Sequence, residues 1–465
     1  MKARSRAQVG VGILVCLLLA AGAARAGIEV EPYLQDPQPD GMTVLWWTDQ
    51  SAPDSKVEYG QGKLDKSAAA SDEFVPSMKM WRHAAKLGGL AKATSYEYRV
   101  RSGPSQSRQY AFKTAGDRTD GLRVAILGDG RTDNDKVIGW HRQVVKAARE
   151  KKPDLAFELG DAVYEGYDYC WRDLYRRVLT ATDGNDPGSD LGSVVPYHLA
   201  VGNHEIYDHG WSGGLDTSMA RFRAFTSAPP NGAKDPNWAG RYYAVQYGCA
   251  TFLVLDVNNT SKPALDNHGK LPAGSTPDWE EGSEQHAWMV RQLEKAKADS
   301  AFTFVLMHPA PYTRGIHGTS EANVDYQRGY ELRVLDPLFR RYGVAAVLCS
   351  HDHLVEHCLT GPVGFEAKMD VTDPANLNWL VQGNSGEGAR SPQAGWEKWM
   401  SIRGDGAAPF FSTYFYDWEG TDLRSFLLIE IEKQPGGKWK AGFQTVRTDG
   451  KAFDTFSLVR PAPTK

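Results

Sequence analysis

The segment PDLAFELGDAVY at residues 153–164 decides the fold of the larger part of this chain. Its apolar run is typical of a buried strand, and the run ends abruptly at Gly160 and Asp161. An earlier segment, LRVAILGD at residues 122–129, has the same form, and residues 136–152 between the two have helical periodicity. Strand, helix and strand in this order predict an α/β layered domain.

The same alternation continues toward the C-terminus. Further strands are predicted at 193–205, 248–259, 301–308 and 344–353, and helices at 282–298 and 336–343. From about residue 421 the chain reads as antiparallel hairpins. Residues 121–465 are therefore expected to form one domain.

Residues 27–116 have a different pattern, with short strand-like segments and no helical segment between them. MTVLWWT at 42–48 alternates and is rich in β-formers, and strand segments at 55–60, 94–103 and 107–114 follow between turn residues. This spacing predicts a small β-sandwich, joined by a polar linker at 115–121. A length of 465 residues suits two domains.

Residues 1–26 read as a secretory signal, with three basic residues, a short apolar run and the sequence ARA at 24–26. The protein is therefore expected to be secreted or periplasmic; the alternative is an uncleaved membrane anchor. No other stretch is long and apolar enough to span a bilayer. Cleavage would change the net charge from −4 to −8, because it removes four basic residues and no acid, and this excludes the footprint of a nucleic-acid binder.

Four of the five cysteines would remain after cleavage, since Cys16 lies in the signal. An even number in an exported protein allows one or two disulfides among Cys170, Cys249, Cys349 and Cys358. The pair Cys349–Cys358 is favoured, because the two are close in sequence and flank the end of a strand.

Metal-capable side chains follow the predicted strands at their C-terminal ends, where α/β sheets form ligand sites. In chain order they are Asp129, Asp161, Tyr164, Asn203, His308, His351 and His353. Carboxylate, phenolate, amide oxygen and imidazole suit iron, zinc or manganese rather than a thiolate site. Two such metals, bridged by a carboxylate, can clamp a transferring phosphoryl group.

The series GDG, GDAVY, GNHE, VLMH and SHDH closely resembles the purple acid phosphatases, within the calcineurin-like metallophosphoesterases. The resemblance extends to the N-terminal module. It implies two domains: an all-β sandwich of the fibronectin III or immunoglobulin type at 27–116, and an α/β metallophosphoesterase β-sandwich flanked by helices at 121–465. Most calcineurin-like phosphoesterases carry a histidine two residues after the first aspartate, which this chain lacks, and the family that lacks this histidine uses the tyrosine present here as Tyr164.

The resemblance also implies a binuclear centre of Fe(III) plus a divalent ion, which is iron, zinc or manganese. One metal would be held by Asp129, Asp161, Tyr164 and His353. The other would be held by Asp161, Asn203, His308 and His351, with Asp161 bridging. One residue departs from the family pattern, because the last motif usually begins with Gly and here begins with Ser350.

The implied activity is hydrolysis of small phosphate monoesters by attack of a metal-bound hydroxide, with His204 and His317 as catalytic contacts to the substrate. A surface-loop role is the alternative for His317, and Arg131, Arg314 and Tyr312 are weaker candidates for substrate contact. Residues 383–420 are expected at the rim of the site. Two other functions stay open, a phosphodiesterase or nucleotide hydrolase on the same metals and an adhesion protein with a silent phosphatase fold.

Overall fold

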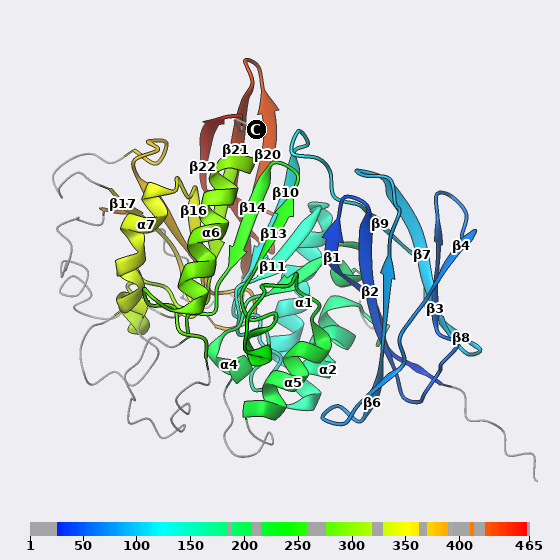
Figure 1. The fold of residues 1–465 in the computed structure, drawn as a ribbon. Coiled ribbons are helices and arrows are strands. Elements are labelled where there is room, and N and C mark those ends of the chain that lie inside the picture. Colours follow the sequence, from blue (N-terminus) through cyan, green and yellow to red (C-terminus); the bar gives the residue numbers. More distant parts are fainter. Residues whose placement is uncertain are drawn as a thin grey trace, which may run out of the picture.

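The computed structural model describes residues 26–184, 188–206, 215–258, 276–318, 329–361, 370–388, 390, 392, 410–412 and 424–462. These residues form a smaller β domain beside a larger two-sheet domain (Figure 1). The expected signal at 1–26 lies outside the described residues apart from Ala26. Among the helices described, none is long and apolar enough to cross a membrane.

The N-terminal domain is built from two antiparallel sheets. The first has the order β1 (Ile28–Gln38), β2 (Gly41–Thr48), β6 (Met80–Leu87), β5 (Glu73–Val75). The second has the order β4 (Lys66–Ala69), β3 (Lys56–Gly60), β7 (Ser95–Ser102), β8 (Ser105–Gln106), with β9 (Tyr110–Lys113) also paired to β7. Val44 and Trp46 of the first sheet share one buried core with Val57 and Tyr98 of the second. The expected β-sandwich is therefore present.

The larger domain also consists of two sheets. One has the order β12 (Tyr197–Leu199), β11 (Leu155–Glu158), β10 (Leu122–Leu127), β20 (Ser425–Gln434), β21 (Lys438–Arg447), β22 (Ala452–Pro461). The other has the order β13 (Tyr243–Tyr247), β14 (Ala250–Val254), β15 (Phe302–Leu306), β16 (Ala346–Cys349), β18 (Leu377–Gln382), β17 (Val355–Thr360), β19 (Phe410–Ser412). Phe157 on the first packs against Phe252 on the second, with ring centroids 5.1 Å apart, so the sheets face each other.

Helices cover the outer faces of this sandwich (Figure 1). α1 (Asp135–Glu150) buries Val144 and Ala148 against the sheet of β10, and α6 (Glu284–Asp299) buries Trp288 and Leu293 against the sheet of β15. The remaining helices are α2 (Asp168–Asp173), α3 (Leu191–Val194), α4 (Asn203–Ile206), α5 (Leu215–Phe225) and α7 (Asp336–Arg341). The expected α/β sandwich flanked by helices is therefore confirmed.

The C-terminal hairpins complete the first sheet. β20 pairs antiparallel with β10, so the last strands of the domain extend the sheet that its first strand begins. The strand expected at 193–205 is shorter than predicted, because only Tyr197–Leu199 is extended. Pro196, which lacks an N–H, precedes it, and α4 begins at Asn203.

The predicted disulfide Cys349–Cys358 is wrong, because all four cysteines of the described chain are free and buried. Cys349 lies on β16 and Cys358 on β17, and β18 runs between these two strands. Neighbouring strands are about 4.8 Å apart, so two spacings separate the backbones of β16 and β17 by roughly 10 Å. A disulfide needs Cα atoms within about 7 Å.

The two domains share an aromatic seam. Trp47 of β2 stacks on Phe225 of α5, with ring centroids 4.4 Å apart, and Tyr33 of β1 lies equally close to Tyr175. Successive residues of β2 therefore point to two different cores, the sandwich interior and the seam, which is why the whole strand is buried.

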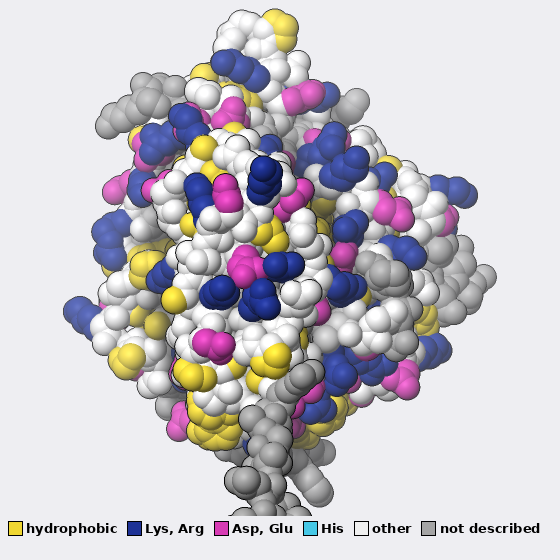
Figure 2. All heavy atoms as spheres, turned by 90° about the vertical axis from the view of Figure 1, so that its right-hand side faces the viewer, with side chains coloured by type: hydrophobic (Ala, Val, Ile, Leu, Met, Phe, Trp, Pro, Cys, Tyr) yellow, Lys and Arg dark blue, Asp and Glu magenta, His cyan; other side chains and the backbone are white. Residues whose placement is uncertain are grey.

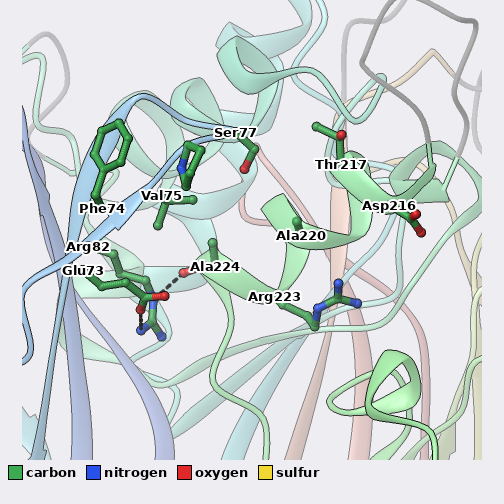
Figure 3. A pocket seen from close by; sticks show the side chains of 11 residues that line it. Glu73, Phe74, Val75, Ser77, Arg82, Asp216, Thr217, Ala220, Arg223 and Ala224 are labelled. Carbon is green, nitrogen blue, oxygen red and sulfur yellow. Dashed lines mark hydrogen bonds and ion pairs between the residues drawn. The ribbon is translucent and has the colours of Figure 1, made fainter.

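Beside this seam a hollow of about 560 Å³ separates β5 and β6 from α5 (Figure 3). Phe74 and Arg82 line it from the N-terminal domain, and Asp216, Thr217 and Arg223 line it from α5. Arg82 donates a 2.6 Å hydrogen bond to the carbonyl oxygen of Ala224 at its edge. The hollow contains none of the predicted metal ligands.

The side of the molecule formed by the N-terminal domain carries mixed charge. Figure 2 shows Lys and Arg side chains interspersed there with Asp and Glu. On this visible face neither sign of charge forms a continuous patch.

Candidate metal centre

The predicted ligands follow parallel strands of both sheets. Asp129, Asp161 and Asn203 come after β10, β11 and β12, and His308 and His351 come after β15 and β16. Parallel strands bring their C-terminal ends to one edge of a sheet, so the facing sheets direct these residues toward one place.

Three of these tips have a strained backbone. The φ angles of Asp129, Asp161 and His351 are 54°, 52° and 73°, in the left-handed region that ordinary residues rarely adopt. Such strain costs about 1–3 kcal/mol per residue and clusters at functional sites, where the surrounding structure imposes it.

Glycines allow the tips of β11 and β12 to approach each other closely. A Cβ added at Gly160 would lie 2.7 Å from the backbone nitrogen of Gly202, and one at Gly202 would lie 2.3 Å from Oδ1 of Asp161. Neither position has room for a side chain. The Gly before each ligand in GDAVY and GNHE is therefore a steric requirement.

The centre of the cluster is formed by Asp161, His308 and His351, whose ligand atoms lie within 4.8 Å of one another. Nε2 of His308 is 3.2 Å from Oδ1 of Asp161 and 2.9 Å from Oδ1 of Asn203. On the other side of its ring, Nδ1 of His308 donates to the carbonyl oxygen of Leu159 at 2.9 Å. This hydrogen bond to Leu159 fixes the orientation of the His308 ring, with Nε2 directed at Asp161 and Asn203.

A second group adjoins the first. Nε2 of His353 is 3.4 Å from Oδ1 of Asp129, and Oδ2 of Asp129 accepts a 2.8 Å hydrogen bond from the backbone N–H of His351. Tyr164 lies at the edge, with its ring centroid 5.6 Å from that of His204. The structure therefore gathers six of the seven predicted ligands by direct contacts and places the seventh beside them.

Several buried polar atoms of this cluster have no hydrogen-bond partner among the described residues. Among the described residues, four of these atoms are buried and make no hydrogen bond: Oδ1 of Asp129, Oδ2 of Asp161, Nε2 of His351 and Nδ1 of His353. Buried polar groups normally find a partner, so four orphans at one place need an explanation. Oxygen and imidazole donors of this kind fit first-row transition metals, which would satisfy them.

The ionisation of the cluster indicates the same need for cations. Burial raises the pKa of Asp129 to about 6, with Asp161 adding to the effect. Burial lowers the pKa of His308, but Asp161 outweighs it and the pKa rises to about 9, so a proton lies where His308 faces the carboxylate. Burial, Asp133 and Glu165 raise the pKa of Tyr164 despite Arg131, so a phenolate here would require a closer cation.

Both histidines predicted to contact substrate lie in the site. His317 is 5% exposed and its ring centroid is 3.7 Å from that of His351, so the surface-loop alternative is wrong. Nδ1 of His204 bonds the carbonyl oxygen of Tyr164, and its Nε2 accepts from the Arg131 guanidinium at 2.8 Å. Burial lowers the pKa of both imidazoles, to about 3 for His204.

The three weaker candidates for substrate contact differ in their surroundings. Arg314 is paired with Glu356 at 3.2 Å and Tyr312 packs on Trp379, so both have structural contacts. Arg131 instead reaches the cluster of predicted metal ligands, where it contacts Asp161 and His353.

Gly130 has a steric role. A Cβ here would lie 2.2 Å from His141 and 2.3 Å from the carboxylate of Glu158. Any side chain at this position would therefore require both neighbours to move.

Sequence reasoning missed the residues that hold the ligand loops. The buried carboxylate of Glu205 accepts hydrogen bonds from four backbone N–H groups around Asp161 and Gly202. The hydroxyl of Ser350 is 2.9 Å from Nδ1 of His308 and donates to Leu159 at 3.0 Å, so the departure from glycine adds a contact. Glu205 could have been found from its place in GNHE, whereas the sequence marked Ser350 only as a departure from the family pattern.

The described part of the predicted rim segment, residues 383–388, 390, 392 and 410–412, begins against the Asp129 loop. Ser385 N–H donates to the Gly128 carbonyl and Glu387 N–H to the Asp129 carbonyl, both at 3.0 Å. The rest of 383–420 lies outside the described residues.

Family models match both domains. The calcineurin-like phosphoesterase model matches residues 122–355, and the model of the purple acid phosphatase N-terminal domain matches residues 29–114. The chain therefore belongs to the calcineurin-like phosphoesterases. Its N-terminal domain is of the purple acid phosphatase type, as the motifs predicted.

Several relatives are similar over much of the chain. An uncharacterized protein of Mycobacterium tuberculosis is 25% identical over 358 residues, which are 71% of this chain and 62% of that protein. The chain thus spans less than two thirds of this relative. Probable purple acid phosphatase 20 of Arabidopsis thaliana is 23% identical, covering 74% of this chain and 72% of the relative. Other Arabidopsis relatives are named probable inactive purple acid phosphatases.

The structure of a purple acid phosphatase from yellow lupin (Lupinus luteus) seeds has the same fold. The TM-score is 0.65 at 17% identity, covering 92% of this chain and 74% of that one. At this identity the similarity shows the arrangement of the two domains and no more.

Proposed function

We propose that this protein is an exported binuclear-metal phosphatase that hydrolyses phosphate monoesters. The observation that carries the proposal is the set of four buried atoms without hydrogen bonds, on Asp129, Asp161, His351 and His353. A silent phosphatase fold would be expected to have lost or filled such positions. Export rests on the signal-like sequence of residues 1–26.

In this proposal Asp129, Asp161, Tyr164 and His353 hold Fe(III). Asp161, Asn203, His308 and His351 hold a divalent ion, with Asp161 shared. When bound, such a metal pair supplies an activated water at neutral pH and neutralises the oxygens of the transferring phosphoryl group. Two observations support the sharing: Oδ1 of Asp161 contacts His308, and its buried Oδ2 makes no hydrogen bond.

In this proposal His317 contacts the substrate. The ring of His317 lies against that of His351, and Oδ1 of Asp352 accepts a 3.5 Å hydrogen bond from the His317 backbone N–H. The low pKa of His317 makes it a neutral imidazole. A neutral imidazole still donates one N–H, so we assign His317 to a hydrogen bond with the leaving oxygen.

The test combines metal analysis with a substrate panel. Purified mature protein should contain two transition metals per chain, at least one of them iron, and should hydrolyse monoesters faster than diesters. Faster diester hydrolysis would assign the same site to a phosphodiesterase. Full metal content with no turnover of any ester would support the non-enzymatic alternative, and no metal uptake on reconstitution would refute the site.

A further inference from the structure

Arg131 is a buried cation inside the candidate metal centre. It follows Asp129 by two residues, with φ of 49°, and its backbone N–H donates to the Asp161 carbonyl at 3.0 Å. Its side chain is 10% exposed. Nη2 lies 2.8 Å from Nε2 of His204, 3.6 Å from Oδ2 of Asp161 and 3.5 Å from Nε2 of His353. The guanidinium thus faces the predicted ligands of both metals.

Apart from the 2.8 Å contact of Nη2 with His204, the donors of this guanidinium are poorly satisfied. Among the described residues, its buried Nε has no hydrogen-bond partner, and the ion pair of Nη1 with Oε1 of Glu387 is long, at 3.5 Å. A guanidinium has five N–H donors in a fixed planar fork. Burial of a cation with weak contacts is costly, so the position implies a better partner than those present.

An anion with several oxygens would be that partner. A tetrahedral phosphoryl group offers two oxygens at the spacing of the guanidinium fork, and this bidentate contact is among the strongest hydrogen-bonded pairs. Metal ions at the ligands would repel the guanidinium unless negative charge lay between them. With metals bound, the carboxylates of Asp161 and Asp129 would be metal ligands and could not also serve as partners of the guanidinium.

We propose that Arg131 binds the non-bridging oxygens of the phosphoryl group and selects a dianionic monoester, with Glu387 as its counter-ion in the absence of substrate. This inference rests on the proposed function. A monoester keeps three oxygens and two charges for this contact, whereas a diester has one charge and carries a second group in the same space.

Glu387 is fixed in position to act as this counter-ion. The hydrogen bonds of Ser385 to Gly128 and of Glu387 to Asp129 attach its segment to the loop that carries Arg131. A Cβ at Gly386 would lie 1.7 Å from the Gly130 carbonyl oxygen, so the two segments are in direct contact. The carboxylate therefore competes with a bound anion for the guanidinium.

The experiment measures binding of inorganic phosphate to metal-loaded protein by calorimetry, with metal content determined for each variant. Arg131→Gln should weaken phosphate binding on the order of 10- to 100-fold at unchanged metal content, because it removes a charge-assisted bidentate contact. The phosphate affinity of Arg131→Lys should lie between those of the wild type and Arg131→Gln, because lysine keeps the charge but lacks the planar fork of N–H donors. Glu387→Gln as a single change should tighten phosphate binding several-fold. Added to Arg131→Gln, it should leave phosphate binding unchanged.

The control is Arg123→Gln, which removes an exposed arginine paired with Glu430 at 2.6 Å and should not alter phosphate binding. In kinetics, Arg131→Gln should lower kcat/KM for monoesters more than for diesters. Unchanged phosphate affinity in Arg131→Gln, or loss of metal from both Arg131 variants, overturns the inference. If the wild type binds phosphate through Arg131 but hydrolyses no ester, the proposed function fails and the assignment of Arg131 stands as an anion site.

Discussion

Replacement of Glu205 by Gln tests whether one buried carboxylate holds the two ligand loops together. Oε2 of Glu205 accepts from the backbone N–H of Asp161 at 2.9 Å and of Gly202 at 2.7 Å. Oε1 accepts from Ala162 at 2.9 Å and Val163 at 3.3 Å. Glutamine keeps one acceptor oxygen, so in either orientation an NH₂ group would face two backbone donors.

The expected loss is large. Each buried donor left without an acceptor costs about 1–3 kcal/mol, so two of them cost about 2–6 kcal/mol of the free energy of unfolding. The same change would displace Asp161 and weaken metal binding. The matched control is Glu430→Gln, because Glu430 lies in an exposed ion pair with Arg123 and such pairs contribute about 0–1 kcal/mol.

The assay is urea unfolding of metal-free protein, followed by elemental analysis after reconstitution. Burial and the neighbouring Asp161 raise the pKa of Glu205 to about 7, so measurements at pH 8 compare an ionised carboxylate with the amide. We expect a lower unfolding midpoint and reduced metal content in Glu205→Gln only. A variant within 0.5 kcal/mol of the wild type, as a rough limit of the measurement, and with full metal content would refute the role of this carboxylate.

Three further predictions concern the metal centre and the thiols. His308→Ala should lose metal and turnover together, whereas His317→Ala should keep its metals and lose on the order of 10²-fold in rate, less for nitrophenyl esters; metal loss in His317→Ala would contradict the assignment. Oxidised wild type should show a visible charge-transfer band that Tyr164→Phe abolishes, and a colourless, active, iron-loaded wild type would exclude tyrosinate–iron. Thiol titration of the denatured mature protein without reductant should find four free thiols, and fewer than four would indicate a disulfide. In the native protein these thiols should be protected, because all four are buried: Cys170, Cys249, Cys349 and Cys358.

The sequence by itself determined the order of the elements and the identity of the ligand candidates. Apolar runs that end in Gly-Asp or Gly-Asn mark buried strands with polar tips, and this local pattern needs no tertiary information. The N-terminal sandwich could be predicted for the same reason, because alternation in MTVLWWT and its neighbours reflects local strand geometry.

The tertiary structure decided the contacts that join distant segments. The four cysteines looked available for pairing, but the insertion of β18 between β16 and β17 separates Cys349 from Cys358. Glu387 meets Arg131 across 256 positions of chain, and no periodicity relates the two. The sequence left His317 open between a substrate contact and a surface loop, and only the folded chain shows its buried ring against that of His351. Local geometry and polarity are encoded within a few residues, whereas these contacts depend on how whole sheets face each other.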